Sequence, residues 1–164
     1  MSRTLLLLRH AKSSYPDGVV DHDRPLAERG IREAPLAGDW IRVHAPAVDA
    51  VLCSSATRTR QTLDRAGIDA PVQYLEEIYD ATPGTVLGAI NGVDAAVSTL
   101  LVIAHEPAVS SLALGLAGPG SDADAVGEIS AKYPTSAIAV LTTNGPWSRL
   151  SLRGAALVAF HVPR

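Results

Sequence analysis

The sequence predicts an α/β fold in which short apolar strands alternate with helices around a mostly parallel sheet. Apolar runs of strand length recur along the chain, and segments with helical spacing of apolar residues separate them. No repeat or linker interrupts this alternation. The chain has 164 residues, of which 47% are hydrophobic and 19% are charged, so it can bury a full core. We therefore expect one domain that spans residues 1–164.

The first half of the chain shows two strands and two helices. Thr4 to Arg9 is a short apolar run that opens into a polar loop, as a buried strand does. Apolar positions from Leu26 to about His44 recur at helical spacing. Pro35 interrupts this pattern at a cost of about 3 kcal/mol, so the helix either kinks there or starts there as a shorter helix. Asp49 to Cys53 reads as a second buried strand.

The next helix is expected over Ala56 to Ala66, with Ser54 or Ser55 as its N-cap and Gly67 after its end. The remaining elements are two strands and two helices in alternation, followed by three closing strands. The expected strands are Pro71–Leu75, Leu100–Ala104, Ser136–Thr142, Arg149–Leu152 and Ala156–Val162, and the expected helices run from Thr82 to Ile90 and from Pro107 to about Leu116.

Charge and cysteine content narrow the classes of partner and compartment. Lys and Arg number 14 and Asp and Glu number 17, which gives a net charge of −3 and no general attraction to nucleic acid or to an anionic membrane. The single cysteine, Cys53, excludes an internal disulfide framework and favours a reducing, cytoplasmic location. Arg9 ends the apolar run Leu5–Leu8 too early for a signal peptide or a membrane span.

Three apolar strands end in residues that can bind an oxyanion. Arg9 and His10 follow the first strand, Arg58 lies in the helix after the second, and His105 with Glu106 follows a later one. Ligands of open α/β sheets bind at the carboxyl ends of the strands, and helix N-termini favour anions there. Each residue alone is more often a surface or structural group. Their combination predicts a site for a phosphoryl group.

Four segments carry a resemblance to a known family. They are Arg9-His10-Ala11-Lys12-Ser13, Asp23-Arg24-Pro25-Leu26 leading to Gly30, Ser54-Ser55-Ala56-Thr57-Arg58-Thr59-Arg60-Gln61-Thr62, and His105-Glu106-Pro107. In this order they resemble the histidine phosphatase superfamily, whose fold is phosphoglycerate mutase-like. The short chain and Pro134-Thr135-Ser136-Ala137-Ile138 are most similar to its SixA-type phosphohistidine phosphatases.

The resemblance implies a three-layer αβα sandwich, with His10 as the phosphate acceptor and Arg9, Arg58 and His105 as the phosphate pocket, beside Glu106. It also implies that no metal or other cofactor takes part. A neutral imidazole is a good nucleophile, and arginine guanidinium groups hold phosphoryl oxygens by charge-assisted hydrogen bonds. Arg9, Arg58 and a protonated His105 could therefore replace a metal ion.

The general acid is the ambiguous part of the site. Glu77 best matches the superfamily's acid, but Glu76 and Asp80 lie in the same segment. An imidazole is far easier to expel than an alkoxide, so a missing acid would favour phosphohistidine over phosphate esters. Only residues 78–104 separate Glu77 from His105, which leaves little chain for a lid and suits a phosphorylated protein as substrate.

Two other functions remain open at this point. The same chemistry could serve a phosphatase or mutase that acts on small phosphate esters, or the pocket could be a noncatalytic module that binds a phosphorylated partner. Ala11 and Lys12 stand where much of the superfamily carries glycine and an acid, which weakens a sugar-phosphate or phosphoglycerate specificity. A cysteine phosphatase is excluded because Thr59 stands where Cys53 would need an arginine. A nucleotide-binding P-loop motif is also absent from the sequence.

Overall fold

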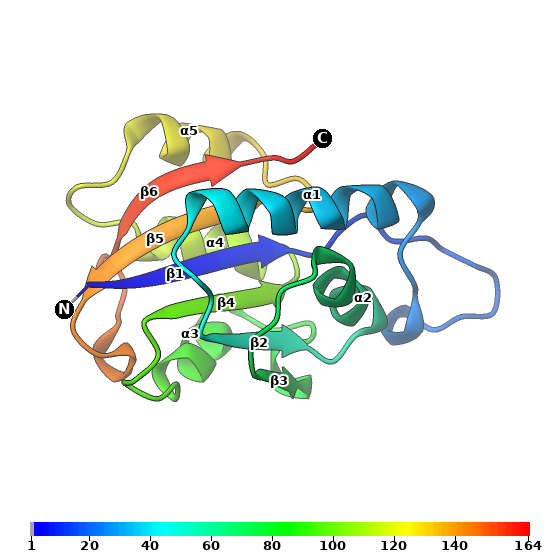
Figure 1. The fold of residues 1–164 in the computed structure, drawn as a ribbon, viewed down its shortest axis with the longest axis horizontal. Coiled ribbons are helices and arrows are strands. Elements are labelled where there is room, and N and C mark those ends of the chain that lie inside the picture. The colour runs from blue at the N-terminus through cyan, green and yellow to red at the C-terminus, as the bar shows by residue number, and fades with distance from the viewer. Residues whose placement is uncertain (1) are drawn as a thin grey trace.

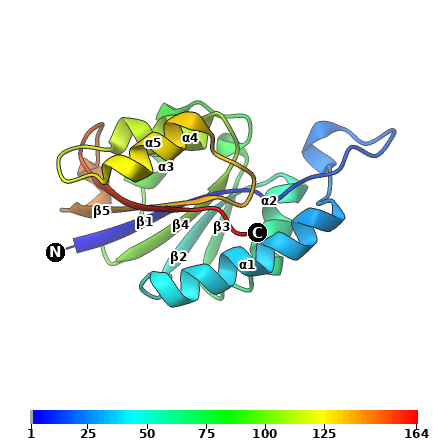
Figure 2. The same ribbon diagram turned by 90° about the horizontal axis from the view of Figure 1, so that it is seen from above.

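A computed structural model describes residues 2–164 and contains a sheet of six strands between two layers of helices (Figures 1 and 2). The strands are β1 (Ser2–Arg9), β2 (Ala50–Ser54), β3 (Val72–Leu75), β4 (Thr99–Ala104), β5 (Ile138–Asn144) and β6 (Ala156–His161). Their order is β3-β2-β4-β1-β5-β6. Strands β3, β2, β4 and β1 pair in parallel with one another, whereas β5 pairs antiparallel with both β1 and β6. The predicted α/β fold with a mostly parallel sheet is confirmed.

Five α-helices cover the two faces of the sheet. They are α1 (Glu28–His44), α2 (Thr57–Ala66), α3 (Pro83–Asn91), α4 (Ala108–Leu116) and α5 (Ala123–Ala131), with short 3-10 turns η1 (Asp21–Asp23), η2 (Glu76–Ile78) and η3 (Trp147–Arg149). Figure 2 shows α1 and α2 on one face and α3, α4 and α5 on the other, which is the expected three-layer sandwich. No helix within residues 2–164 is long and apolar enough to cross a membrane.

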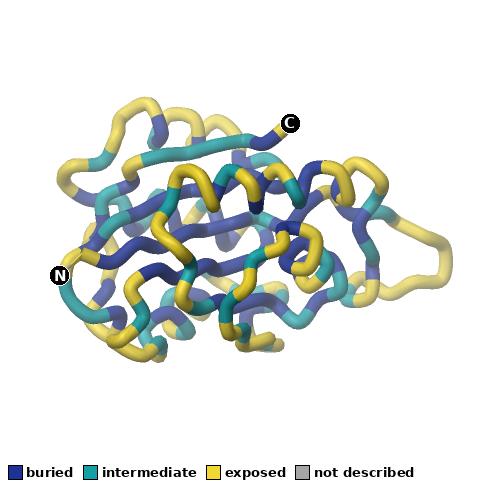
Figure 3. Tube along the Cα trace, in the orientation of Figure 1, coloured by how far each residue is buried: buried dark blue, intermediate teal, exposed yellow. Residues whose placement is uncertain are grey.

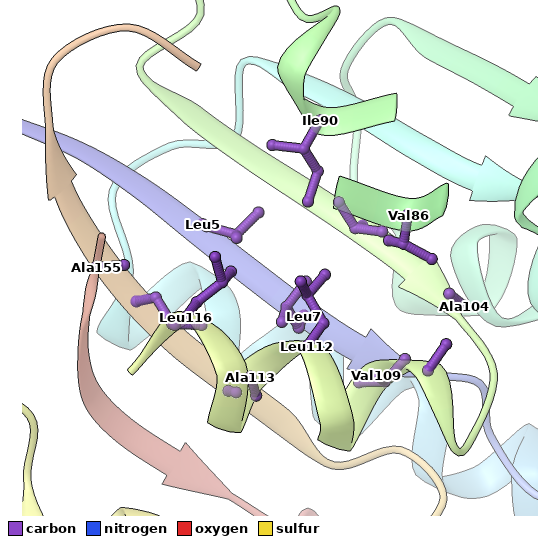
Figure 4. Packing of buried hydrophobic residues seen from close by; sticks show 14 of the residues in the cluster. Leu5, Leu7, Val86, Ile90, Ala104, Val109, Leu112, Ala113, Leu116 and Ala155 are labelled. Carbon is purple, nitrogen blue, oxygen red and sulfur yellow. The ribbon is translucent and has the colours of Figure 1, made fainter. Parts of the chain in front are cut away.

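The central strand β1 joins two hydrophobic cores because its side chains alternate between the faces. Leu5 and Leu7 pack against α3 and α4, as Figure 4 shows, while Leu6 and Leu8 pack against α1 and α2. The central strands are buried along most of their length (Figure 3). A strand held on both faces cannot shift its register, so the residues that follow β1 have a defined position.

Pro35 lies well inside α1, so the helix does not begin at this residue. The buried face of α1 extends on both sides of the proline, from Gly30 to Ile41. This packing holds the helix together despite the missing backbone N–H, because tertiary contacts supply most of the stability of such helices.

Three other predictions about secondary structure were wrong. The segment Arg149–Leu152 is not a strand: the backbone carbonyls of Trp147 and Leu150 accept hydrogen bonds from the Asn91 side chain instead of forming a ladder. Helix α5, which has Asp122 as its N-cap and buries few residues, was not predicted. The N-cap of α2 is Ala56 rather than a serine, which leaves the hydroxyls of both preceding serines for other partners.

Candidate active site

The carboxyl ends of β1, β2 and β4 lie side by side because these strands are parallel neighbours. Arg9 is paired with Ala104, so His10 and His105 leave adjacent strands at the same edge, and the centroids of their rings are 5.2 Å apart. A cavity of about 190 Å³ opens there. Its lining residues are Arg9, His10, Lys12, Ser13, Tyr15, Arg24, Arg58, His105, Glu106 and Thr135.

Hydrogen bonds from three directions hold the backbone around His10. Its N–H donates to the carbonyl of Ala104 in β4 (3.2 Å), and its own carbonyl accepts from Ser136 N–H (3.1 Å). The next N–H, that of Ala11, donates to the Thr62 hydroxyl in α2 (3.0 Å). The imidazole therefore projects from a rigid part of the backbone.

The hydrogen bond of the His10 ring determines which nitrogen can react. Nδ1 lies 2.7 Å from the carbonyl oxygen of Ala11. A carbonyl only accepts, so Nδ1 carries the hydrogen and Nε2 of the neutral ring carries the lone pair. Burial lowers the pKa of His10 to about 3, and the positive charges of Arg58 and Arg9 act in the same direction. At neutral pH the ring is uncharged, as a nucleophile must be.

Each of three neighbouring side chains has a buried nitrogen without a partner among residues 2–164. These atoms are Nε of Arg9, Nε of Arg58 and Nδ1 of His105. Other nitrogens of the two arginines are engaged: Arg9 donates to the carbonyl of Tyr133 (2.9 Å), and Arg58 donates to the carbonyl (2.8 Å) and carboxylate (3.1 Å) of Asp21. Unpaired buried donors are costly, so a ligand with several acceptor oxygens would be stabilised here.

Asp21 and Tyr79 belong to the site although sequence reasoning did not single them out. Asp21 accepts hydrogen bonds from the Tyr79 hydroxyl (2.5 Å), Arg24 Nε (3.0 Å) and Arg58. The Tyr79 hydrogen bond, followed by those of the two arginines, holds the pKa of Asp21 well below its usual range. This carboxylate therefore stays ionised and orients Arg58 rather than serving as an acid. The Tyr79 ring meets the His105 ring edge-on, with centroids 5.6 Å apart.

The structure does not bring Glu77 together with His10. Glu77 is exposed, does not line the cavity, and makes no hydrogen bond or ion pair with another residue of the described range 2–164. Its neighbour Glu76 accepts a hydrogen bond from the Ser55 hydroxyl and lies 3.4 Å from Nε2 of His22. Glu106 does line the cavity, where its carboxylate accepts from Ser110 N–H (2.6 Å) in α4.

The protonation of His105 is not the one that the sequence led us to expect. Burial, followed by the charge of Arg58, lowers the pKa of His105 to about 4, so the ring is neutral at neutral pH. Its Nε2 lies 2.7 Å from the hydroxyl oxygen of Ser54. Among residues 2–164, no group of three or more His, Cys, Asp or Glu side chains is arranged to hold a metal ion.

Comparison with known proteins decides the family. Residues 5–150 match the histidine phosphatase superfamily (branch 1). The chain belongs to this superfamily. The expectation of a phosphatase enzyme is confirmed.

Relatives within the superfamily include proteins of the SixA type. An uncharacterised protein of Mycobacterium tuberculosis is 61% identical over 158 residues, which cover 96% of this chain and 100% of the relative. The phosphohistidine phosphatase SixA of Escherichia coli is 28% identical over 84% of each chain. The structure of a putative phosphohistidine phosphatase SixA from Nakamurella multipartita is 39% identical, with a TM-score of 0.90 and coverage of 99% of this chain and 97% of that one.

Proposed function

We propose that this histidine phosphatase hydrolyses phosphohistidine on proteins through a phosphorylated His10. One observation carries the proposal: the free Nε2 of His10 shares a cavity with three side chains, each of which has a buried nitrogen without a partner. A phosphoryl group has three terminal oxygens that can accept from such donors. Positioning and charge stabilisation are what phosphoryl transfer chiefly needs from a protein.

The reaction has two steps. In the first, the lone pair on Nε2 of His10 forms a bond to phosphorus while the P–N bond to the substrate imidazole breaks. A phosphohistidine ring that already carries a proton on its other nitrogen leaves as neutral imidazole. In the second step, water attacks the phosphorus, the bond to Nε2 breaks, and inorganic phosphate leaves with the neutral His10 ring restored. Arg9, Arg58 and His105 hold the phosphoryl oxygens throughout.

The carboxylates near the cavity favour phosphohistidine over phosphate esters. An alkoxide leaving group needs a proton from a well-placed acid. Asp21 is held ionised by its hydrogen bonds, Glu106 is engaged with α4, and Glu77 is exposed outside the cavity. Since phosphohistidine releases a ring that needs no such acid, it fits these groups better. We therefore expect Glu77→Gln to leave phosphohistidine hydrolysis within about 3-fold of the parent.

The segment between η2 and β4 supports a protein substrate. Helix α3 lies in this segment, and its Val86 and Ile90 are buried in the core against α4. The segment is therefore part of the packed body of the molecule and does not supply a lid. A phosphorylated side chain presented by another protein suits a site over which this segment forms no lid, and the relative from E. coli is named as a phosphohistidine phosphatase.

A panel of substrates in one assay tests the proposal. Phosphohistidine peptide and a histidine-phosphorylated protein are compared with sugar phosphates, nucleotides and p-nitrophenyl phosphate. We expect the phosphohistidine substrates to have the highest kcat/KM and His10→Ala to abolish their turnover. Efficient turnover of sugar phosphates or nucleotides with phosphohistidine untouched would instead establish a small-ester phosphatase.

A further inference from the structure

Ser54 contacts a cavity histidine but has no part in the two steps above. It ends β2 and is wholly buried, and its Oγ lies 2.7 Å from Nε2 of His105. The same Oγ accepts a hydrogen bond from Ala56 N–H at 3.3 Å. Within residues 2–164 it has no other hydrogen-bond partner. The direction of the Ser54–His105 hydrogen bond therefore decides which nitrogen of the neutral ring carries the hydrogen.

Only one direction satisfies both groups. If Nε2–H of His105 donated to Ser54, the serine hydroxyl hydrogen would be buried without an acceptor, which costs free energy. Nδ1 of His105 would then be a bare acceptor, unable to bind a phosphoryl oxygen. If the Ser54 hydroxyl donates to Nε2, the serine is satisfied and Nδ1 carries the hydrogen. Nδ1 is the buried atom that has no partner within the described chain.

We propose that Ser54 is a positioning residue that holds neutral His105 in the tautomer with hydrogen on Nδ1, so that an uncharged imidazole donates to the phosphoryl group. The identity of the ligand rests on the proposed function, whereas the tautomer does not. Both cavity histidines then carry their hydrogen on Nδ1, but they offer the ligand opposite groups. His10, held through Nδ1 by Ala11, presents a lone pair, and His105, held through Nε2 by Ser54, presents a donor.

The surroundings of His105 make an uncharged donor useful. Arg58, Arg9 and His22 oppose a second proton on the ring, whereas Asp21 favours one. The titratable and charged groups around the ring are Arg9, His10, Asp21, His22, Arg58, Tyr79 and Glu106. A donor that does not depend on protonation keeps working as the pH rises above the usual range of histidine.

Nitrogen NMR of the protein labelled with ¹⁵N-histidine tests the tautomer directly. Signals of His105 are assigned by their loss in His105→Gln. Near neutral pH we expect a protonated Nδ1 and an unprotonated Nε2 for this ring. A ring with hydrogen on Nε2 alone, or on both nitrogens, overturns the proposal. This readout needs no turnover, so it remains decisive if the proposed function fails.

The pH profile of Ser54→Ala tests the consequence for catalysis, with Ser55→Ala as the matched control. Without Ser54, a neutral His105 is free to place its hydrogen on Nε2, and the Nδ1 donor is then secured only by protonation. With p-nitrophenyl phosphate we expect Ser54→Ala to lose about 10-fold in kcat/KM near pH 8. The deficit should narrow as the pH is lowered below about 5, toward the pKa of His105, while Ser55→Ala follows the parent.

If Ser54→Ala lost the same factor in kcat/KM at every pH, Ser54 would have a merely structural role and the proposal would be overturned. An unchanged kcat/KM at every pH would also overturn it. If Ser54→Ala does not fold, the NMR measurement on the parent protein decides. A parent that releases no phosphate from any substrate contradicts the proposed function, yet its His105 signals still test the tautomer.

Discussion

Three side chains around the cavity are each fixed by hydrogen bonds and keep one further nitrogen without a partner within residues 2–164. Arg9 is held by the Tyr133 carbonyl, Arg58 by Asp21 and the His10 ring by the Ala11 carbonyl. The Nε atoms of the two arginines have no partner within residues 2–164, and Nε2 of His10 keeps its lone pair. Donors held in place in this way need no reorganisation when charge develops on a phosphoryl group.

Replacing Arg58 by lysine tests whether this fixed geometry matters beyond charge. Lysine keeps the positive charge, but it cannot bind Asp21 through two nitrogens and still keep a third N–H for a ligand. We expect Arg58→Lys to lose about 10²- to 10³-fold in kcat/KM, as expected for a lost transition-state donor. Steady-state kinetics with p-nitrophenyl phosphate measure the loss.

Arg60→Lys is the matched control for this experiment. Arg60 lies in the same helix, is exposed, and stacks over the Tyr74 ring at 4.9 Å from its centroid. Its kinetics should stay within about 2-fold of the parent. If Arg58→Lys behaved like this control, charge alone would suffice and the bond to Asp21 would have no catalytic importance.

Among the helices and strands, the sequence predicted those whose formation depends on a local pattern of apolar residues. The buried strands carry unbroken apolar runs, so β1, β2 and β4 were found, and with them the convergence of His10, Arg58 and His105. Elements stabilised by tertiary contacts were not found. The segment before β6 is shaped by hydrogen bonds from Asn91, and α5 has only two fully buried residues.

The same limit applies to the site. Asp21 and Tyr79 are 58 residues apart and meet only in the folded chain, so no spacing rule could pair them. The tautomers of His10 and His105 depend on Ala11 and Ser54 through hydrogen bonds that have no sequence signature. The position of Glu77 outside the cavity likewise follows from the path of η2.

The contact between α1 and α2 makes a sharp prediction about stability. A Cβ atom at Gly38 would lie 1.9 Å from the carbonyl oxygen of Ala66, at the end of α2. Because α2 carries Arg58, the helices must separate to admit a methyl group. We expect Gly38→Ala to lower the free energy of unfolding in urea by about 3 kcal/mol.

Gly127→Ala provides the control for this substitution. Gly127 lies in α5, and nothing is within 4 Å of the place where its Cβ would be. Since alanine is the better helix former, stability should rise by up to about 1 kcal/mol. A Gly38→Ala protein as stable as the parent would contradict the close packing of α1 on α2.

For the whole molecule, the buried histidines predict a loss of stability in acid. The folded protein lowers the pKa of His10 to about 3 and that of His105 to about 4, from 6.5. Between these values the unfolded chain binds more protons, so the free energy of unfolding rises with pH. Stability is full above pH 6.5 and falls as the pH decreases, by at most about 1.4 kcal/mol per pH unit for each ring.

Urea unfolding at about pH 7 and pH 5 measures this dependence. The double variant His10→Gln, His105→Gln should lose less stability between the two pH values than the parent. Equal losses in both proteins would show that other groups cause the acid sensitivity.

Treatment with a chelator tests whether the intact enzyme needs a metal ion to stabilise the phosphoryl oxygens. In the proposed reaction Arg9, Arg58 and His105 stabilise the phosphoryl oxygens. We expect prolonged treatment with EDTA to leave the rate of p-nitrophenyl phosphate hydrolysis unchanged. Loss of activity that added Mg²⁺ restores would contradict this assignment.

Trapping the phosphorylated enzyme tests the central claim most directly. The protein is mixed with ³²P-labelled phosphohistidine substrate, quenched in alkali within the first turnover, and mapped by peptide mass spectrometry. We predict phosphate that is stable in alkali and labile in acid on His10, and none in His10→Ala. Turnover by the parent without a phosphorylated His10, or unchanged turnover by His10→Ala, would contradict it.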